Sequence, residues 1–553
     1  MANKKSTTKK KATKKSTTSL AKTSVAKPAS KPASSSSAST STKTTTNKQP
    51  KTGLLIGLAL AAIVAIVGVV VAVFCLNRPG SPSDPTEMLD YSTAFFIYDN
   101  GKYSLWNADG KRVSEDDYVN QSSFVAGYAM VKKDDQYGII REDGKTSVDY
   151  GKYGTIASRG GLYLAEDGNT KEEFLITGNG TVLEKGTDLD ADSPNSTAGF
   201  ATVINDGKMK IYTYNGKLIA EAEVSGEEDP SMNSMNDFGI VHYNDKNWLF
   251  DSRNGELLAT FDGERYNFDS VSDSRNMILL DDYEESEKYK LFANGKMYEL
   301  NETKNYGLTD LDLVIGYDNY DELALLGDDY KVLRRVTTYI DLKDANNYAM
   351  EKDDGGVEIY YNGEKVKEFG DESEIAESSL LYDDLVAVKD GEKYKFYNLN
   401  GSVAFDKEFK NVDSLFDKNH HAIVSDDGDN YYLIGTNGNK IGEVTATKIS
   451  YYTGGYEAMN KDDKYAILDK NGKQVTDYKY DSLYYRGTAE PRNIWTAKLE
   501  DGSTDVVDVE NNKVVLEKAK TESFYENYFT VRNGDGDTEY YTYDGTLFYT
   551  KKK

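Results

Sequence analysis

The chain has little of the residue types that most often carry chemistry or covalent cross-links. It has one cysteine and three histidines in 553 residues. A single cysteine excludes an intramolecular disulfide, so packing and backbone pairing must hold any folded domain together. The shortage of histidine removes the commonest side chain of acid-base and metal chemistry. These absences favour a non-catalytic scaffold over an enzyme.

Charge is divided unevenly along the chain. Residues 1–52 carry 13 lysines, no arginine and no acidic residue, which leaves 53 basic and 92 acidic residues afterwards. The formal net charge after residue 52 is therefore 53 − 92 = −39. Such a charge repels nucleic acid and other anionic polymers, and it favours cationic partners for the acidic part.

The longest apolar run, Gly53–Leu76, has no charged residue. Its 24 residues would span about 36 Å as a helix, enough to cross a hydrocarbon core of about 30 Å. The run is longer than the apolar region of a signal peptide, and the bulky Phe74 before Cys75 is unlike a lipoprotein cleavage site. We therefore predict one transmembrane helix, with the lysine-rich side in the cytoplasm and the C-terminal part outside the cell.

The segments on either side of this run have compositions that do not form a core. Residues 1–52 are rich in Lys, Ser and Thr, which predicts a disordered cytoplasmic tail. The tail either sets the membrane topology only, or also attracts anionic lipid or nucleic acid. Residues 77–88 are rich in Pro and Ser and are predicted to be a linker.

A turn dipeptide recurs through the rest of the chain with a period of about 36 residues. Most copies are Asn-Gly or Asp-Gly, a pair typical of a type I′ hairpin turn with positive φ at both central residues. Asp328-Asp329 and Asn511-Asn512 are weaker substitutes. The second residue of the pair falls at 110, 144, 180, 216, 255, 295, 329, 363, 401, 438, 472, 512 and 545.

Each unit contains alternating segments that predict three strands around two turns, and a fourth strand fits before the next unit. No segment has sustained helical spacing, so the expected fold is all-β. Seven residues before the turn glycine, six units carry an aromatic residue that we expect to lie in the core. These residues are Tyr103, Tyr137, Trp248, Tyr394, Tyr431 and Tyr465.

The unit DDQYGIIREDGK, residues 134–145, resembles the WG-repeat family of bacterial proteins. The resemblance extends over roughly residues 90–550, although only Tyr137 is followed by the family's glycine. In the other five units, the residue that follows the aromatic residue is Ser104, Leu249, Lys395, Tyr432 or Ala466. The resemblance implies repeat-mediated binding and little more.

Units of four short antiparallel strands suit the blades of a β-propeller. Thirteen units exceed the usual 4 to 8 blades of one ring, so the sequence predicts tandem β-propellers. We assign 89–344 to a first propeller of about seven repeats and 345–553 to a second of about six. An open β-solenoid is the alternative.

The sequence contains no recognisable catalytic motif. His242, His420 and His421 have no metal-ligand or triad partners at a known spacing, and we expect them to be solvated. Acidic residues alternate at Asp188, Asp190 and Asp192. A second alternation gives a candidate calcium loop, although the glycine of the EF-hand pattern is missing. Its ligands would be Asn533, Asp535, Asp537 and Glu539.

We therefore expect a non-catalytic binding or adhesion scaffold at a bacterial cell surface, without an organic cofactor. Its partners would be a cationic protein, or a neutral glycan that stacks on tyrosine rings. Two alternatives stay open at this point. One is a transmembrane sensor that signals through the basic tail, and the other is an extracellular glycan-active enzyme.

Overall fold

The computed structural model describes residues 92–553 except 226–228, 273, 284–287, 320–321, 338–339, 353–354, 377–379, 487–492 and 521. The described residues are all-β, without an α-helix, and no helix among them could cross a membrane. The predicted tail 1–52, transmembrane helix 53–76 and linker 77–88 lie outside this part of the chain. The structure divides into two compact units at Gly263 and Glu264.

The unit that ends at Gly263 contains nineteen strands in its described residues. They are β1 (Ala94–Asp99), β2 (Lys102–Asn107), β3 (Arg112–Tyr118), β4 (Asn120–Gln121), β5 (Tyr128–Lys133), β6 (Gln136–Arg141), β7 (Thr146–Val148), β8 (Thr155–Arg159), β9 (Leu162–Glu166), β10 (Glu173–Thr177), β11 (Val182–Gly186), β12 (Asp190–Asp192), β13 (Phe200–Asn205), β14 (Lys208–Thr213), β15 (Leu218–Glu223), β16 (Ser231–Met235), β17 (Phe238–Tyr243), β18 (Lys246–Asp251) and β19 (Glu256–Asp262).

The unit that begins at Glu264 contains the other strands. They are β20 (Tyr266–Val271), β21 (Met277–Asp282), β22 (Tyr289–Ala293), β23 (Lys296–Leu300), β24 (Asn305–Leu308), β25 (Val314–Asn319), β26 (Glu322–Leu326), β27 (Val332–Val336), β28 (Ile340–Asp344), β29 (Asn347–Glu351), β30 (Val357–Tyr361), β31 (Glu364–Glu368), β32 (Glu374–Ile375), β33 (Leu385–Lys389), β34 (Tyr394–Asn398), β35 (Val403–Phe409), β36 (Asn411–Ser414), β37 (His421–Ser425), β38 (Tyr431–Gly435), β39 (Lys440–Ala446), β40 (Lys448–Tyr452), β41 (Gly455–Met459), β42 (Tyr465–Asp469), β43 (Ser482–Tyr485), β44 (Ile494–Lys498), β45 (Thr504–Asp508), β46 (Lys513–Ala519), β47 (Glu522–Phe524), β48 (Phe529–Arg532), β49 (Thr538–Tyr541) and β50 (Leu547–Lys551).

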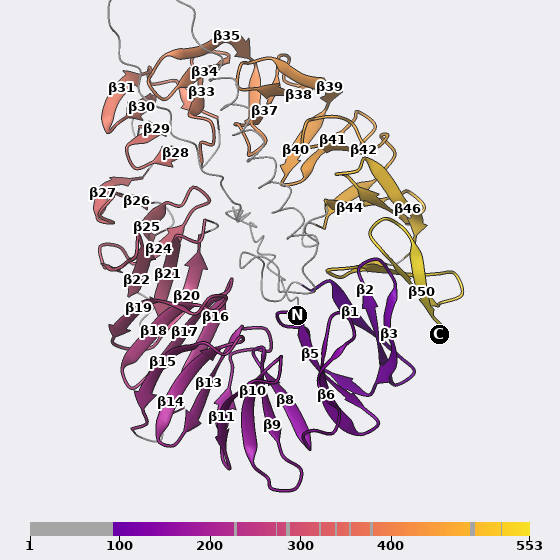
Figure 1. The fold of residues 1–553 in the computed structure, drawn as a ribbon. Coiled ribbons are helices and arrows are strands. Elements are labelled where there is room, and N and C mark those ends of the chain that lie inside the picture. The colour runs from indigo at the N-terminus through magenta and orange to yellow at the C-terminus, as the bar shows by residue number, and fades with distance from the viewer. Residues whose placement is uncertain are drawn as a thin grey trace, which may run out of the picture. The chain divides into compact units, whose positions relative to one another are not determined.

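These strands form thirteen antiparallel sheets, and within each sheet the strands follow chain order. Eleven sheets have four strands in the described residues, and β1–β3 and β40–β42 have three. Figure 1 shows the sheets as separate blades, for example β8–β11 and β12–β15. The prediction of an all-β, thirteen-repeat β-propeller arrangement is confirmed. The division into two rings at 344/345 stays a prediction, and Asp344 is the last residue of β28.

Hydrophobic cores form between consecutive sheets, because the sheets carry apolar side chains on both faces. On β5, Ala129 and Val131 pack against Leu105 of the preceding sheet. The intervening Met130 packs against Tyr163 of the following sheet. Successive side chains of a strand point to opposite faces, so one strand contributes to two cores. A single repeat could not bury both faces alone.

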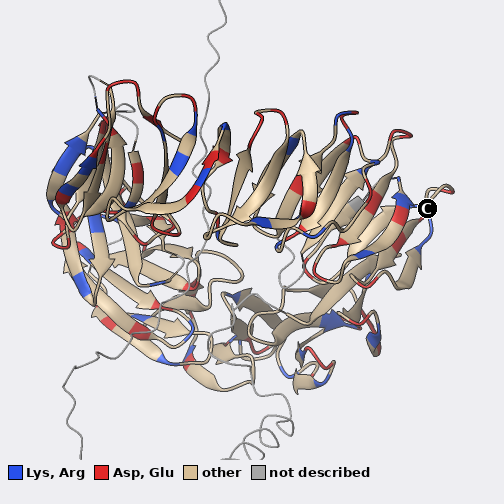
Figure 2. Ribbon diagram, turned by 90° about the horizontal axis from the view of Figure 1, so that it is seen from above, with Lys and Arg blue, Asp and Glu red and all other residues tan. Residues whose placement is uncertain are grey.

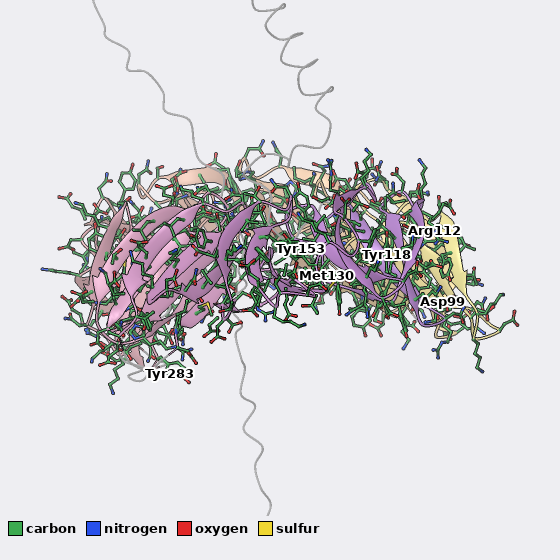
Figure 3. The ribbon with its side chains drawn as sticks, turned by 60° about the horizontal axis from the view of Figure 1, so that its bottom comes forward. Asp99, Arg112, Tyr118, Met130, Tyr153 and Tyr283 are labelled. Atoms are coloured by element: carbon green, nitrogen blue, oxygen red, sulfur yellow. The ribbon has the colours of Figure 1, made fainter. Side chains whose placement is uncertain are left out.

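The fourth strands of several sheets are largely exposed. In β31 only one of the five residues is even partly buried, and in β15 three of the six are fully exposed. Figure 2 shows Asp and Glu on many of the turns that join the strands. In Figure 3, the buried Tyr118, Met130 and Tyr153 lie among the strands, whereas Tyr283, which is 59% exposed, lies at the outer boundary of its sheet.

The repeated turn between the third and fourth strands is not the predicted type I′ turn in most repeats. Of the eleven Asn-Gly and Asp-Gly pairs, only 294–295 and 362–363 have positive φ at both residues. In the others only the glycine is left-handed, as at Gly144 with φ 76°. Gly144 N donates to Arg141 O at 2.9 Å, and Arg141 N donates to Lys145 O at 2.9 Å. This is a type I turn followed by a G1 bulge.

The turn type explains why asparagine or aspartate precedes the glycine. The side chain of this asparagine or aspartate accepts a hydrogen bond from the backbone N–H two residues later. Asn400 Oδ1 accepts from Ser402 N at 3.0 Å, and Asp544 Oδ1 accepts from Thr546 N at 3.0 Å. In the turns where only the glycine is left-handed, the first residue of the dipeptide therefore supplies this side-chain cap and does not need positive φ.

Several of the turn glycines also contact the preceding repeat. A Cβ added to Gly216 would lie 2.7 Å from Leu183 Cδ2, and one added to Gly438 would lie 2.6 Å from Phe405 Cδ2. Polar bonds join the same two regions, since Ser147 Oγ donates to Gly178 O at 2.8 Å. The turn thus has a second role, because it packs one repeat on the fourth strand of the repeat before it.

Of the six aromatic residues seven positions before the turn, two are buried in the core as predicted, and the other four are partly buried. Trp248 and Tyr394 are buried, and the rings of Tyr103 and Tyr137 pack against core clusters. The ring contacts of Tyr103 are with Phe96 and Tyr98 of its own repeat, at 6.5 and 4.8 Å between centroids. Gly138 leaves room for the ring of Tyr150, which an added Cβ would approach to 2.9 Å.

Candidate functional site

Three of the predicted calcium residues, Asn533, Asp535 and Asp537, lie in the turn between β48 and β49, and Glu539 is on β49. Asn533 Oδ1 accepts hydrogen bonds from the backbone N–H of Asp535 and of Asp537, both at 3.0 Å. Asn533 Nδ2 donates to Glu539 Oε1 at 2.9 Å, and the Asp537 carboxylate lies 2.8 Å from Lys552 Nζ. The side chains of Asn533, Asp537 and Glu539 thus have partners within the protein. Calcium binding at this loop stays a prediction.

The other acidic alternation is on β12, where Asp190 and Asp192 flank the buried Ala191. Burial, and then the charges of Asp229 and Asp192, raise the pKa of Asp190. Across the described parts of the chain, no three or more His, Cys, Asp or Glu side chains are grouped so that they could hold a metal ion.

Two of the three histidines have partners that sequence spacing did not indicate. His420 Nδ1 lies 2.7 Å from Asp383 Oδ1, and the His420 side chain is 68% exposed. His421 is half-buried, with Nδ1 2.9 Å from the hydroxyl of Tyr456. The expectation of a solvated side chain therefore holds for His420 but not for His421.

These contacts belong to a group that we call the Asp417 cluster. Its members come from the connection between the first and second strands of two sheets and from the facing ends of β40 and β41. They are Asp383, Asp417, His420, His421, Tyr451 and Tyr456.

Asp417 is the most enclosed carboxylate of the cluster, at 7% exposure. Its Oδ1 accepts the backbone N–H of Asn419 at 2.7 Å and of His421 at 3.3 Å. Its Oδ2 accepts the hydroxyl proton of Tyr456 at 2.6 Å. Because that proton is given to Asp417, the Nδ1 of His421 must donate to the Tyr456 oxygen, and the His421 Nε2 is then the acceptor. This chain of bonds joins two neighbouring sheets.

Neighbouring connections extend the cluster over five consecutive sheets. Tyr382 donates its hydroxyl to Asp310 Oδ2 at 3.3 Å, which joins the β32–β33 connection to the β24–β25 connection. Lys343, on β28, pairs with Asp384 at 3.0 Å and donates to Tyr382 O. The site thus combines residues that lie up to 146 positions apart in the sequence.

Burial shifts the proton affinity of these groups. It raises the pKa of Asp417 to about 6, and the charge of Asp383 acts in the same direction. Burial, followed by the charge of His420, lowers the pKa of His421. The pKa of Tyr456 is raised by burial and by Asp417, and that of Tyr451 is raised by burial and then by nearby charges including Asp417. The cluster therefore has neutral imidazole at His421 and protonated tyrosines at neutral pH.

Sequence reasoning missed this site because its parts have no common motif. The adjacent pair His420-His421 was the only local signal. Strand pairing and the packing of successive sheets bring those residues to Asp383 and Tyr456, which lie 37 and 35 residues away.

No family model matches this chain, and no curated protein sequence is similar to it. Among solved structures, it is similar to a computationally designed protein named Ika8, with 13% identity over 51% of this chain and 86% of that chain, at a TM-score of 0.23. A structure described as the eukaryotic initiation factor has 10% identity over 83% and 96%, with a TM-score of 0.26. BamB from Moraxella catarrhalis has 12% identity over 51% and 94%, with a TM-score of 0.18. These likenesses are too distant to carry an argument about function.

Proposed function

We propose that this protein is a non-catalytic binding or adhesion scaffold held at a cell surface by the apolar segment 53–76. In this proposal the repeats form tandem β-propellers of a WG-repeat-like, bacterial type outside the cell, and the lysine-rich tail lies in the cytoplasm. The partner is a protein with basic surface groups, or a glycan.

The observation that carries the proposal is the Asp417 cluster. Five consecutive sheets contribute polar side chains from their first connections or from the strand ends beside them, while the cores between sheets are mainly apolar. Connecting segments on a rigid scaffold are the usual place for recognition residues. The formal net charge of −39 after residue 52 supports a cationic partner, which the field of the protein would attract.

The test uses the full chain, purified in detergent or in a lipid nanodisc, against a panel of basic proteins, acidic proteins and neutral glycans. We expect surface plasmon resonance to show binding to basic proteins that weakens from low to high salt, because screening shortens the range of charge attraction. Binding that does not change with salt would contradict the electrostatic part. Absence of binding to every member of the panel would contradict the scaffold itself.

A second candidate function is glycan hydrolysis, which one observation favours. The pKa of about 6 at Asp417 is in the range expected for a general acid. Against it, both carboxylate oxygens of Asp417 already accept bonds from the protein. Release of reducing sugar from a glycan panel by the wild-type chain, and its loss in Asp417→Asn, would favour the enzyme over the scaffold.

A further inference from the structure

The chain contains ten Asn-Gly pairs, and they differ in the bonding of the glycine N–H. For three of the glycines, Gly101, Gly295 and Gly534, the described residues supply no acceptor for this N–H. In the other seven pairs the N–H donates to a backbone oxygen at 2.8 to 2.9 Å. These glycines are Gly180, Gly216, Gly255, Gly363, Gly401, Gly438 and Gly472. The dipeptide is the same in all ten pairs, so a difference in their chemistry must come from the fold.

Two of these three pairs, Asn100-Gly101 and Asn294-Gly295, each form the entire loop of a two-residue hairpin. Both residues of each pair have positive φ and are exposed. In such a type I′ turn, the residues that flank the loop make the hydrogen bonds, which leaves the glycine N–H to solvent. A Cβ added to Gly101 or Gly295 would meet nothing within 4 Å, so neither glycine packs against another described segment.

The asparagine side chains of these two pairs are also largely unbonded. Among the described residues, no donor reaches the Oδ1 of Asn100 or of Asn294, and Asn294 Nδ2 makes only a long bond to the Tyr330 hydroxyl at 3.4 Å. By contrast, Asn215 Oδ1 accepts a hydroxyl proton at 2.6 Å. The Oδ1 of Asn533, the third asparagine whose glycine N–H is unbonded, accepts two backbone N–H groups at 3.0 Å. In Asn100-Gly101 and Asn294-Gly295, therefore, neither the glycine N–H nor the asparagine Oδ1 is held.

We infer that Asn100 and Asn294 are sites of spontaneous deamidation, a modification that does not depend on the proposed function. In this reaction the backbone nitrogen of the following glycine attacks the asparagine Cγ and forms a cyclic succinimide. The side-chain nitrogen leaves as ammonia and takes the proton of the glycine N–H. Water from the solvent then adds to a carbonyl carbon of the ring and opens it, which yields aspartate or isoaspartate. Glycine favours the attack because it has no Cβ to obstruct the ring.

Hydrogen bonds decide the rate because the reaction needs both groups to be unbonded. The glycine nitrogen must lose its proton and turn toward Cγ, which breaks any bond that its N–H donates. A bonded Oδ1 likewise holds the asparagine side chain away from the attacking nitrogen. Each bond that must break first slows the reaction by about fivefold, so a pair with both bonds should react about tenfold or more slowly than Asn100 or Asn294.

The two products change the hairpin in different ways. Aspartate adds a negative charge at the tip of the loop. Isoaspartate lengthens the backbone by a methylene group, and the length of a hairpin loop fixes the register of its strands. Isoaspartate formed from Asn294 should therefore weaken the pairing of β22 with β23, which begins at Ala293 and Lys296.

The experiment incubates the full chain in detergent at mildly alkaline pH, once folded and once in denaturant. Peptide mapping by mass spectrometry then follows each Asn-Gly pair. In the unfolded chain we expect all ten pairs to react at similar rates, because the dipeptide is the same. In the folded chain we expect Asn100 and Asn294 to react at least about tenfold faster than Asn215. Equal rates at these three positions in the folded chain would overturn the inference.

Asn362 separates the effect of the turn type from that of the hydrogen bond. It also lies in a turn with positive φ at both residues, but Gly363 N donates to Asn346 O at 2.8 Å. We expect Asn362 to react about fivefold more slowly than Asn294 in the folded chain. Equal rates would show that the N–H bond does not select the site and would contradict the inference.

A matched pair of double variants tests the assignment in the folded chain. Asn100→Gln with Asn294→Gln should remove the early phase of ammonia release, since the longer glutamine side chain forms a ring much more slowly. Asn215→Gln with Asn362→Gln should leave that phase unchanged. Early ammonia release that persists in the first double variant would place the reaction elsewhere and overturn the inference.

Discussion

The repeats have two kinds of connection between strands, and only one of them keeps a similar sequence from repeat to repeat. The turn between the third and fourth strands repeats in sequence and geometry, from Asp143-Gly144 to Asp544-Gly545. The connection between the first and second strands varies, and between β36 and β37 it carries Asp417 and His420, with His421 at the start of β37. The first kind packs many of the repeats together and keeps an Asn-Gly or Asp-Gly pair in eleven of the thirteen units. The second kind is not tied to this packing and can carry recognition residues.

The sharpest test of the packing role is Gly545→Ala. Gly545 is left-handed, with φ 89°, and an added Cβ would collide with the backbone oxygen of Val515 in the preceding repeat. We expect a loss of about 3 kcal/mol of stability, from backbone strain and overpacking together. Gly295→Ala is the control, since Gly295 is also left-handed but nothing lies within 4 Å of its added Cβ. Thermal unfolding and amide hydrogen exchange of the flanking repeats would show the difference, and equal losses would contradict it.

Tyr456→Phe tests the variable connection. The variant leaves the Asp417 carboxylate without its hydroxyl donor, so we expect a loss of about 2 kcal/mol when Asp417 is ionised. The loss should shrink below the pKa of about 6, because protonated Asp417 no longer carries a buried charge. Unfolding is measured by circular dichroism at a series of pH values.

The sign of this pH effect follows from the shift at Asp417. Its folded pKa is above the ordinary value of 3.8, so the folded state holds more protons between those two values. The contribution of this group to stability therefore rises as the pH falls through about 6. Tyr478→Phe, whose hydroxyl has no partner in the described residues, should show no such pH-dependent loss.

A smaller effect distinguishes the two turn types within the repeated connection. Asn215 accepts hydrogen bonds from Lys217 N at 3.3 Å and from the Thr213 hydroxyl at 2.6 Å, and only the following glycine is left-handed. Asn294 is itself left-handed, with φ 52°. We expect Asn215→Gly to cost about 1 kcal/mol and Asn294→Gly to be neutral or slightly stabilising. The reverse order in thermal unfolding would mean that the turns are wrongly assigned.

Ser147→Ala should give the smallest effect. It removes the bond from Ser147 Oγ to Gly178 O of the next repeat, at 2.8 Å, and we expect a loss of about 0.5 kcal/mol. Amide hydrogen exchange should become faster in the Asn179-Gly180 turn and stay unchanged in the rest of the unit. A uniform change across the unit would indicate that the bond does not join the two repeats locally.

The repeat spacing predicted the thirteen sheets because each unit has the same local demand for strands and tight turns. The aromatic position before the turn was also recognised, as Trp248 and Tyr394 show. The predicted type I′ turn was wrong in most repeats, because an Asn-Gly pair is compatible with two turn geometries. Packing on the fourth strand of the preceding repeat selects between these geometries. The pairing of His421 with Tyr456 was missed because it depends on which strand ends become neighbours.

The sequence by itself determined the period, the all-β class and the acidic character of the repeats, since these follow from local residue patterns and from counting charges. Only the tertiary structure decided that strands such as β5 bury both faces, and that Asp383, Asp417 and Tyr456 form one cluster. The physical reason is that contacts between repeats depend on how sheets pack, and distant residues with no shared motif carry no local signal of that packing.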